Sequence, residues 1–272
     1  MSSYLDSDEV YIRNDDDLSE SLRAMQNERL EIFTQQNLEE GLFDIAFEVE
    51  GKTLHAHKFI IASISETMKC WLSDRWTAKD EVIKIENYSY DEFYEFLTFL
   101  YSSQCKLTKE NIVKMTDMAE FYGVQCLKDF CDEFLTAMKK SVETIEELFV
   151  FAQTYSLPKL ESSLESFFWS NYEKLCKSDA FISFKKPFVE FLCAVDFIYR
   201  CKKEILFESV YKWAEHRILK DKSVDGDESF NLLEAVKAEL STFLSHFYFP
   251  KMDFNFLMDF VGMLFYFPYL YI

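Results

Sequence analysis

Between residues 45 and 50 of this chain, the large apolar residues Ile45, Phe47 and Val49 alternate with Ala46, Glu48 and Glu50. Such a period of two is typical of a β-strand with one buried face. Gly51-Lys52 predicts a tight turn, because glycine adopts positive φ without a Cβ clash. Residues 53–57 are expected to return as the partner strand. The small apolar residues of 59–64 then predict a buried helix after this hairpin.

Apolar residues recur at the helical period through most of the remaining chain. A first stripe in residues 18–37 predicts a helix whose apolar face consists of Leu22, Met25, Ile32 and Phe33. Further stripes predict helices throughout 91–138, and again at 145–155, 158–175, 206–214 and 230–246.

The second half of the chain is predicted to form antiparallel helical hairpins. Thr144 and Glu147 have the spacing of a capping box, in which each side chain satisfies a free backbone donor at a helix start. Pro158 suits the first turn of the next helix, because its missing N–H would be unpaired there. The short connection between these two helices favours antiparallel packing.

The composition agrees with a mainly helical protein of two domains. The chain has 272 residues, which suffices for two domains of ordinary size, and only 5 glycines and 4 prolines interrupt it. The formal net charge of −19 argues against nucleic-acid binding, which needs clustered Lys and Arg. The same charge would be repelled by an anionic membrane surface.

The termini and the cysteines indicate a cytoplasmic or nuclear protein. Residues 1–20 are acidic with little to bury, so we expect a disordered arm and no signal peptide. The cysteines lie on predicted apolar helix faces without CxxC spacing, so we expect reduced, buried thiols and no zinc site. They are Cys70, Cys105, Cys126, Cys131, Cys176, Cys193 and Cys201.

The segment from Gly41 to Tyr101 closely resembles a BTB/POZ domain. The resemblance rests on Asp44 opening the first strand, Gly51 in the turn, the triplet Ala56-His57-Lys58, and the helix ending near Ser65. It continues in order through VIKIENYSYDEFYEFLTFLYSSQCKL and NIVKMTDMAEFYGVQCLKDFCDEFL. It implies an α+β fold in which helices surround a small sheet, with Gly51 and His57 as structural signature residues.

The second half resembles a BACK domain, an all-α module of helical hairpins. The matching residues are IEELFVFAQTYSLPKLESSLESFF, the Val-x-x-Trp-Ala-Glu core around Trp213, and the Phe-Pro-x-Met turn at Pro250. We therefore predict a disordered arm at 1–20, a BTB/POZ domain at 21–138, a BACK domain at 142–262 and an apolar aromatic tail at 263–272. The fold class is mostly α.

The resemblance implies a homodimer whose leading helix is exchanged across the two-fold axis. The residues expected at the interface are Leu22, Met25, Ile32, Phe33, Asp44 and Lys58. Asp44 and Lys58 correspond to positions at which BTB dimers place buried opposite charges, which need partners because an unpaired buried charge is costly. The alternative for this pair is a helix cap or a surface ion pair.

The resemblance also implies docking to cullin-three. The family motif, a bulky apolar residue, any residue and then glutamate, falls on residues 72–79. Leu72, Trp76 and Tyr122 are the candidate contacts, because aromatic residues often anchor interfaces. Ala78 occupies the position where the family has glutamate.

The sequence predicts no enzymatic activity, no cofactor and no metal site. It contains no Gly-rich phosphate loop, GxSxG or HExxH. His55 and His57 lie on one face of a predicted strand, but no nearby Cys or His completes a zinc site. The tail beyond residue 254 is almost uncharged, but Asp259 and Pro268 argue against a membrane span, and we expect it to fold back onto the last helix.

We therefore expect a protein-interaction scaffold, a homodimeric substrate adaptor of a cullin-three RING ubiquitin ligase. No Kelch, MATH or zinc-finger module is visible, so the protein substrate is expected to contact the acidic arm, the BACK surface or a partner subunit. The alternative is a regulatory BTB protein without a ligase role, which pairs with itself or with another BTB subunit. A third reading, a tail-anchored membrane protein, is disfavoured by Asp259 and Pro268.

Overall fold

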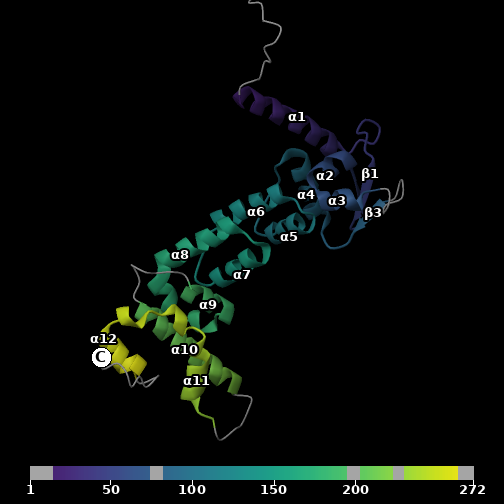
Figure 1. The fold of residues 1–272 in the computed structure, drawn as a ribbon. Helices are drawn as coiled ribbons and strands as arrows, with labels where there is room; N and C mark the ends of the chain where they lie inside the picture. Colours follow the sequence, from purple (N-terminus) through teal and green to yellow (C-terminus); the bar gives the residue numbers. More distant parts are fainter. Residues whose placement is uncertain (1–14, 74–81, 195–202, 223–229, 263–272) are drawn as a thin grey trace, which may run out of the picture. The chain divides into compact units, whose positions relative to one another are not determined.

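The computed structural model describes residues 15–73, 82–194, 203–222 and 230–262, and Figure 1 shows a mostly helical chain. The chain divides into two compact units, Met1–Leu135 and Thr136–Ile272. The predicted fold class is confirmed, because a small three-stranded sheet lies among the helices of the first unit and the second unit is helical where it is described.

The first unit contains the sheet and the first six helices of the chain. Its helices are α1 (Asp15–Gln35), α2 (Lys58–Ile64), α3 (Glu66–Trp71), α4 (Tyr90–Ser102), α5 (Ile112–Phe121) and α6 (Gln125–Ala137), which runs past the end of the unit. Its strands are β1 (Ile45–Val49), β2 (Lys52–Ala56) and β3 (Val82–Ile85).

The sheet has the order β2-β1-β3, so β1 is its central strand. β2 pairs with β1 in an antiparallel hairpin, with Phe47 opposite Leu54. β3 runs parallel to β1, with Phe47 opposite Ile83, and the connection between them includes α2 and α3. A parallel pair requires a long crossover connection of this kind.

The hairpin turn lies one residue earlier than the sequence analysis places it. Glu50 (φ 50°) and Gly51 (φ 74°) are its central residues, and Val49 pairs with Lys52 across it. Positive φ at both positions is the geometry of a type I′ turn, which suits the twist of a two-residue hairpin. Glycine takes one of these positions at no steric cost.

Helix α1 begins at Asp15, so residues 15–20 are helical and do not belong to a disordered arm as predicted. The helix packs on α4 through Phe33, whose ring lies 4.5 Å from that of Tyr101 and 5.4 Å from that of Tyr94. After the helix, the side-chain amide of Gln36 pairs with the backbone of His55. It accepts the N–H at 2.7 Å and donates to the carbonyl at 2.9 Å.

Helix α2 is less buried than its sequence predicts. Ile61 is fully buried, but the Phe59 side chain is 82% exposed. A seven-residue helix has room for one narrow buried stripe, so Ile60 and Ala62 are only half-buried and Ile64 is exposed. This exposed phenylalanine belongs to the surface of the first unit.

The second unit is built from helices and short helical turns. Its helices are α7 (Ile145–Tyr155), α8 (Pro158–Cys176), α9 (Lys186–Ala194), α10 (Lys203–Lys222), α11 (Leu232–Ser241) and α12 (Phe254–Phe256). Its short turns are η1 (Phe181–Ser183), η2 (Leu244–His246), η3 (Phe249–Lys251) and η4 (Leu257–Val261). Figure 1 shows α10 and α11 side by side, and these two helices are in contact.

The α7–α8 hairpin forms as predicted, but without the predicted capping box. Pro158 occupies the first turn of α8. Thr144 flanks the start of α7 in a helical conformation, and its side chain does not cap the helix. Instead, its hydroxyl accepts the backbone N–H of Ser141 at 3.2 Å. A complete capping box occurs at the start of α4, formed by Ser89 and Glu92.

Two buried aromatic residues organise the rest of this unit. Trp213 of α10 is 1% exposed, and its indole N–H donates to the carbonyl of Phe184 at 2.7 Å. Phe207, one α-helical turn and a half earlier, meets other rings edge-on, those of Phe247, Phe249, Phe256 and Phe260. Edge-to-face contacts suit the charge distribution of aromatic rings. The C-terminal turns are thereby held against α10.

Candidate functional site

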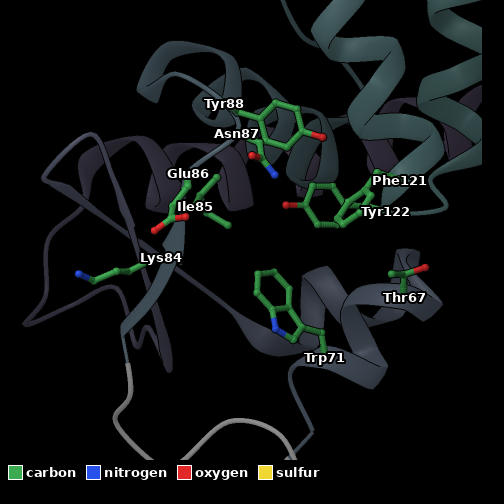
Figure 2. Close-up of a pocket in the computed structure, with 9 residues that line it drawn as sticks. All are labelled: Thr67, Trp71, Lys84, Ile85, Glu86, Asn87, Tyr88, Phe121 and Tyr122. Carbon is green, nitrogen blue, oxygen red and sulfur yellow. The ribbon is translucent and has the colours of Figure 1, made fainter.

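An aromatic pocket lies between α3, β3 and the C-terminal end of α5 (Figure 2). Its volume is about 390 Å³, within the range of typical ligand pockets. All of its lining residues belong to the first unit: Thr67, Trp71, Lys84, Ile85, Glu86, Asn87, Tyr88, Phe121 and Tyr122. We call this hollow the aromatic pocket.

A buried serine fixes the distance between two walls of this pocket. Ser65 precedes α3 and is fully buried. Its hydroxyl donates to the carbonyl of Tyr122 and accepts the N–H of Met68 at 3.0 Å. The same side chain therefore caps α3 and attaches it to the end of α5. Trp71 at the end of α3 is thereby brought near Tyr122, with ring centroids 6.4 Å apart.

The end of α5 is held by a Schellman motif. The N–H of Gly123 donates to the carbonyl of Glu120 at 3.1 Å, and the N–H of Val124 donates to that of Ala119 at 2.8 Å. Gly123 has φ 66°, a conformation that glycine adopts without strain. The motif fixes the backbone of Tyr122, and the ring is held by Phe96 at 5.0 Å.

The hydroxyl of Tyr122 is directed into the aromatic pocket (Figure 2). The residue is 3% exposed, and its hydroxyl has no hydrogen-bond partner among the described residues. Burial, and secondarily the charge of Asp117, raises the pKa of Tyr122 to about 12. The hydroxyl therefore stays protonated at neutral pH and is available as a donor. By contrast, the hydroxyl of Tyr88 donates to Asp117 at 2.9 Å.

A second, acidic hollow of about 530 Å³ adjoins the aromatic pocket. The two hollows share the segment 84–88 as a common wall. The carboxylates of Glu48, Glu50 and Glu86 line this second hollow, together with Lys84 and Ser89. We call it the acidic shelf.

The structure separates the residues predicted for a dimer interface into two groups. Leu22, Met25 and Ile32 of α1 are 51%, 49% and 43% exposed. Phe33 is completely buried against α4 within its own subunit. Phe33 is therefore covered by Tyr94 and Tyr101 of its own chain, and its predicted place at the dimer interface stays a prediction. The exposed group stays a prediction for the interface.

Asp44 and Lys58 are joined through the backbone. The carboxylate of Asp44, which is exposed, accepts the backbone N–H of Lys58 at 2.7 Å. Lys58 is the first residue of α2, and a carboxylate there is favourable because helix N-termini have unpaired N–H groups. This contact is the helix-cap alternative of the sequence analysis. Their interface role remains a prediction.

The candidate cullin contacts occupy different environments. Leu72 and Tyr122 are buried, at 5% and 3% exposure, so most of each side chain is inside the first unit. Trp76 and Ala78 lie outside the described residues. Only the Tyr122 hydroxyl faces the aromatic pocket (Figure 2). The sequence analysis missed Trp71, Asn87 and Phe121 at this pocket. The sequence did offer one indication, because Phe121 is a large apolar residue that lies off the buried stripe of its helix.

The four signature residues are in structured positions. Gly51 is in the β1–β2 turn, and Trp213 is in the core of the second unit. His57 binds Tyr101 and the carbonyl of Gly41. Pro250 lies exposed in η3.

The described residues contain neither a cluster of metal ligands nor a membrane-spanning helix. No group of three or more His, Cys, Asp or Glu side chains there is arranged to hold a metal ion. No helix in the same ranges has the length and apolar character needed to cross a membrane. Cys70 and Cys126 are exposed, so the prediction of buried cysteines was wrong for these two. Cys201 and the tail 263–272 lie outside the described residues.

Comparison with protein families gives two matches in sequence order. Residues 33–139 match the BTB/POZ domain, and residues 145–247 match the BACK domain, "BTB And C-terminal Kelch".

Similar proteins are larger than this chain. Kelch-like protein 24a of Danio rerio is 22% identical over 192 residues, which are 70% of this chain and 32% of that protein. Kelch-like protein 26 of Mus musculus is 24% identical over 176 residues, 64% of this chain and 29% of that protein. The chain thus spans about a third of the length of these relatives. Among solved structures, the BTB domain of human Gigaxonin is 21% identical and has a TM-score of 0.37, covering 48% of this chain and 99% of that domain.

Proposed function

From a chain that contains a BTB/POZ domain followed by a BACK domain, we propose a dimeric protein-interaction scaffold that serves as a substrate adaptor of a cullin-three RING ubiquitin ligase. The observation that supports interaction with other polypeptides is the exposed apolar surface of the first unit. It includes Leu22, Met25, Leu38, Leu42 and Phe59. On α1, Leu22, Met25 and Ile32 recur at helical spacing, and an exposed apolar stripe of this kind is typical of a contact surface.

Self-association through α1 is the first part of this proposal. Replacing Met25 by Glu places a charge on the proposed interface, where desolvation is costly. Light scattering of the intact protein is expected to give twice the chain mass of 32.4 kDa, and the Met25→Glu variant is expected to give the single-chain value. Leu219→Glu is the matched control, because Leu219 is equally exposed on α10 of the other unit. A single-chain mass for the unsubstituted protein would contradict dimerisation.

Cullin binding is the second part, and it rests on the resemblance of residues 72–79 to the family motif. In a pull-down with the immobilised N-terminal domain of cullin-three, the unsubstituted protein is expected to bind and the Trp76→Ala variant is expected not to bind. Ala78→Glu restores the family residue and is expected to strengthen retention, by about tenfold in Kd if one charge-assisted contact is gained. Absence of retention for both the unsubstituted protein and Ala78→Glu would contradict the adaptor role.

A regulatory BTB protein without a ligase role is the second candidate, and Ala78 favours it because the family has glutamate there. Such a protein is expected to dimerise normally through α1 while failing to bind cullin-three. The two measurements above therefore separate the two functions.

A further inference from the structure

The aromatic pocket and the acidic shelf are two hollows that share one short segment as a wall. Both are lined by residues 84–88, which follow directly from the strand β3. One hollow is walled by Trp71, Tyr88, Phe121 and Tyr122, and Phe121 is 62% exposed. A molecule that crosses this segment would therefore meet an apolar recess and a charged surface next to one another.

The charge of the shelf is unbalanced. Among the described residues, Glu48, Glu50 and Glu86 line it together with one basic residue, Lys84. The ammonium of Lys84 lies 3.6 Å from Glu48, so it is already committed to one of the three carboxylates. Glu50 accepts the backbone N–H of Tyr90 at 3.1 Å. The shelf thus offers excess negative charge to a cation.

The aromatic pocket also contains a polar group within reach of an occupant. Tyr122 is nine-tenths buried, and its hydroxyl faces the pocket without a partner among the described residues (Figure 2). An occupant that supplies an acceptor gains a hydrogen bond from this hydroxyl. Aromatic walls with a few converging polar groups are typical of a binding site.

We propose that these two hollows together bind a short extended segment of a partner protein, in which a large apolar or aromatic residue is followed closely by Lys or Arg. The apolar side chain enters the aromatic pocket, where a backbone carbonyl of the segment accepts the Tyr122 hydroxyl. The basic side chain lies on the acidic shelf against Glu86 and Glu50. Residues two apart in an extended segment lie on one face, about 6–7 Å from each other, which suits adjoining hollows. This site is separate from the proposed α1 interface.

The test uses the full chain and a blocked, dye-labelled peptide, Ser-Gly-Phe-Ser-Arg-Gly-Ser, followed by fluorescence anisotropy. We expect binding, with Kd raised about tenfold when the peptide's Arg is replaced by Glu or its Phe by Ala. Higher ionic strength is expected to weaken the binding of the Arg peptide more than the binding of an uncharged peptide, because salt screens exposed charges.

Three variants locate the site on the protein. Glu86→Lys is expected to raise Kd about tenfold, and Tyr122→Phe, which removes only the hydroxyl, about threefold or more. Glu165→Lys changes the net charge equally at an exposed position of α8 and is expected to leave Kd unchanged. Far-ultraviolet circular dichroism and thermal unfolding establish that each variant is folded.

Several outcomes would overturn the proposal. Equal affinity for the original peptide and for its Arg→Glu and Phe→Ala forms would show that the protein does not recognise an apolar and a basic side chain together. If Glu86→Lys and Glu165→Lys raised Kd equally, the binding would depend on the overall charge of the protein and not on the acidic shelf. If N-acetylphenylalanine amide bound as tightly as the peptide, the pocket would recognise a lone aromatic group and the basic residue would contribute nothing. Loss of peptide binding in the Met25→Glu variant would indicate a site formed between two copies. None of these results depends on cullin binding.

Discussion

The hydroxyl of Tyr101 lies 2.7 Å from Nδ1 of His57 and accepts the backbone N–H of the same histidine at 2.8 Å. The other ring nitrogen, Nε2, lies 2.7 Å from the carbonyl oxygen of Gly41. A carbonyl only accepts, so Nε2 of His57 donates to Gly41, and in the tautomer with its proton on Nε2 the other nitrogen, Nδ1, accepts from the Tyr101 hydroxyl. One tyrosine at the end of α4 thereby fixes the corner between β2 and α2.

Tyr101→Phe is therefore expected to destabilise the first unit. The substitution keeps the ring that stacks on Phe33 but leaves two groups of His57 without a partner. Leaving buried polar groups unpaired costs about 1–3 kcal/mol. Urea denaturation would measure the change in the free energy of unfolding. Tyr94→Phe is the control, because no hydrogen bond involves the Tyr94 hydroxyl among the described residues, and an equal loss in both variants would contradict the prediction.

Alkaline pH is expected to weaken the fold through Tyr122. Burial raises the folded-state pKa of Tyr122 to about 12, whereas a tyrosine in the unfolded chain ionises near its ordinary pKa of 10.0. A raised folded pKa gives stability that is complete below pH 10 and is lost as pH rises toward 12, because the unfolded chain loses its proton first. The free energy of unfolding should fall less steeply above pH 10 in Tyr122→Phe than in the unsubstituted protein. Parallel urea titrations at several pH values would test this, and identical slopes would refute it.

Two sites with the same capping-box spacing in sequence are expected to contribute differently to the stability of the fold. Ser89 accepts the N–H of Glu92, and Glu92 returns the contact to the N–H of Ser89 at 2.8 Å. Ser89→Ala should cost about 1 kcal/mol, the usual value of a helix cap. Thr144→Ala should cost less than about 0.5 kcal/mol, because its side chain does not cap α7. Chemical denaturation of both variants checks the difference, and a larger effect at Thr144 would reverse it.

A shared carboxylate is expected to stabilise the second unit. Glu239 of α11 lies 3.3 Å from Lys186 of α9 and 4.0 Å from Arg217 of α10. Glu239→Gln leaves both cations without this anion in a half-buried place, and should cost about 1–2 kcal/mol. Glu234→Gln, which removes an exposed partner of Lys237, should cost less than about 0.5 kcal/mol. Thermal unfolding would rank the two, and equal melting temperatures would count against the prediction.

Thiol reactivity is expected to follow burial. Cys70 and Cys126 are exposed, whereas burial raises the pKa of Cys131 to about 11 and that of Cys193 to about 12. The thiolate is the reactive form, so the exposed pair should react with iodoacetamide at least about tenfold faster at neutral pH. Peptide mapping by mass spectrometry after timed alkylation would resolve each site. Rapid labelling of Cys193 in the folded protein would be the contrary result.

Local patterns determined which elements this chain forms and in what order. The alternation at 45–50 and the small residues after it predicted the hairpin and α2, because strand and helix periods depend on backbone geometry that each segment has by itself. The same holds for Pro158 at the start of α8. The quoted motifs also identified the two domain families, which the family comparisons confirm.

Packing between distant segments decided which side of each element is buried. Phe33 is covered by Tyr94 and Tyr101, which are about 60 residues or more away in sequence, while the adjacent Ile32 is exposed. The aromatic pocket joins Thr67 to Tyr122 through the Ser65 contact. An amino-acid sequence by itself gives the period of an apolar face. Which neighbours cover that face depends on the tertiary structure, because burial is a property of the surrounding segments.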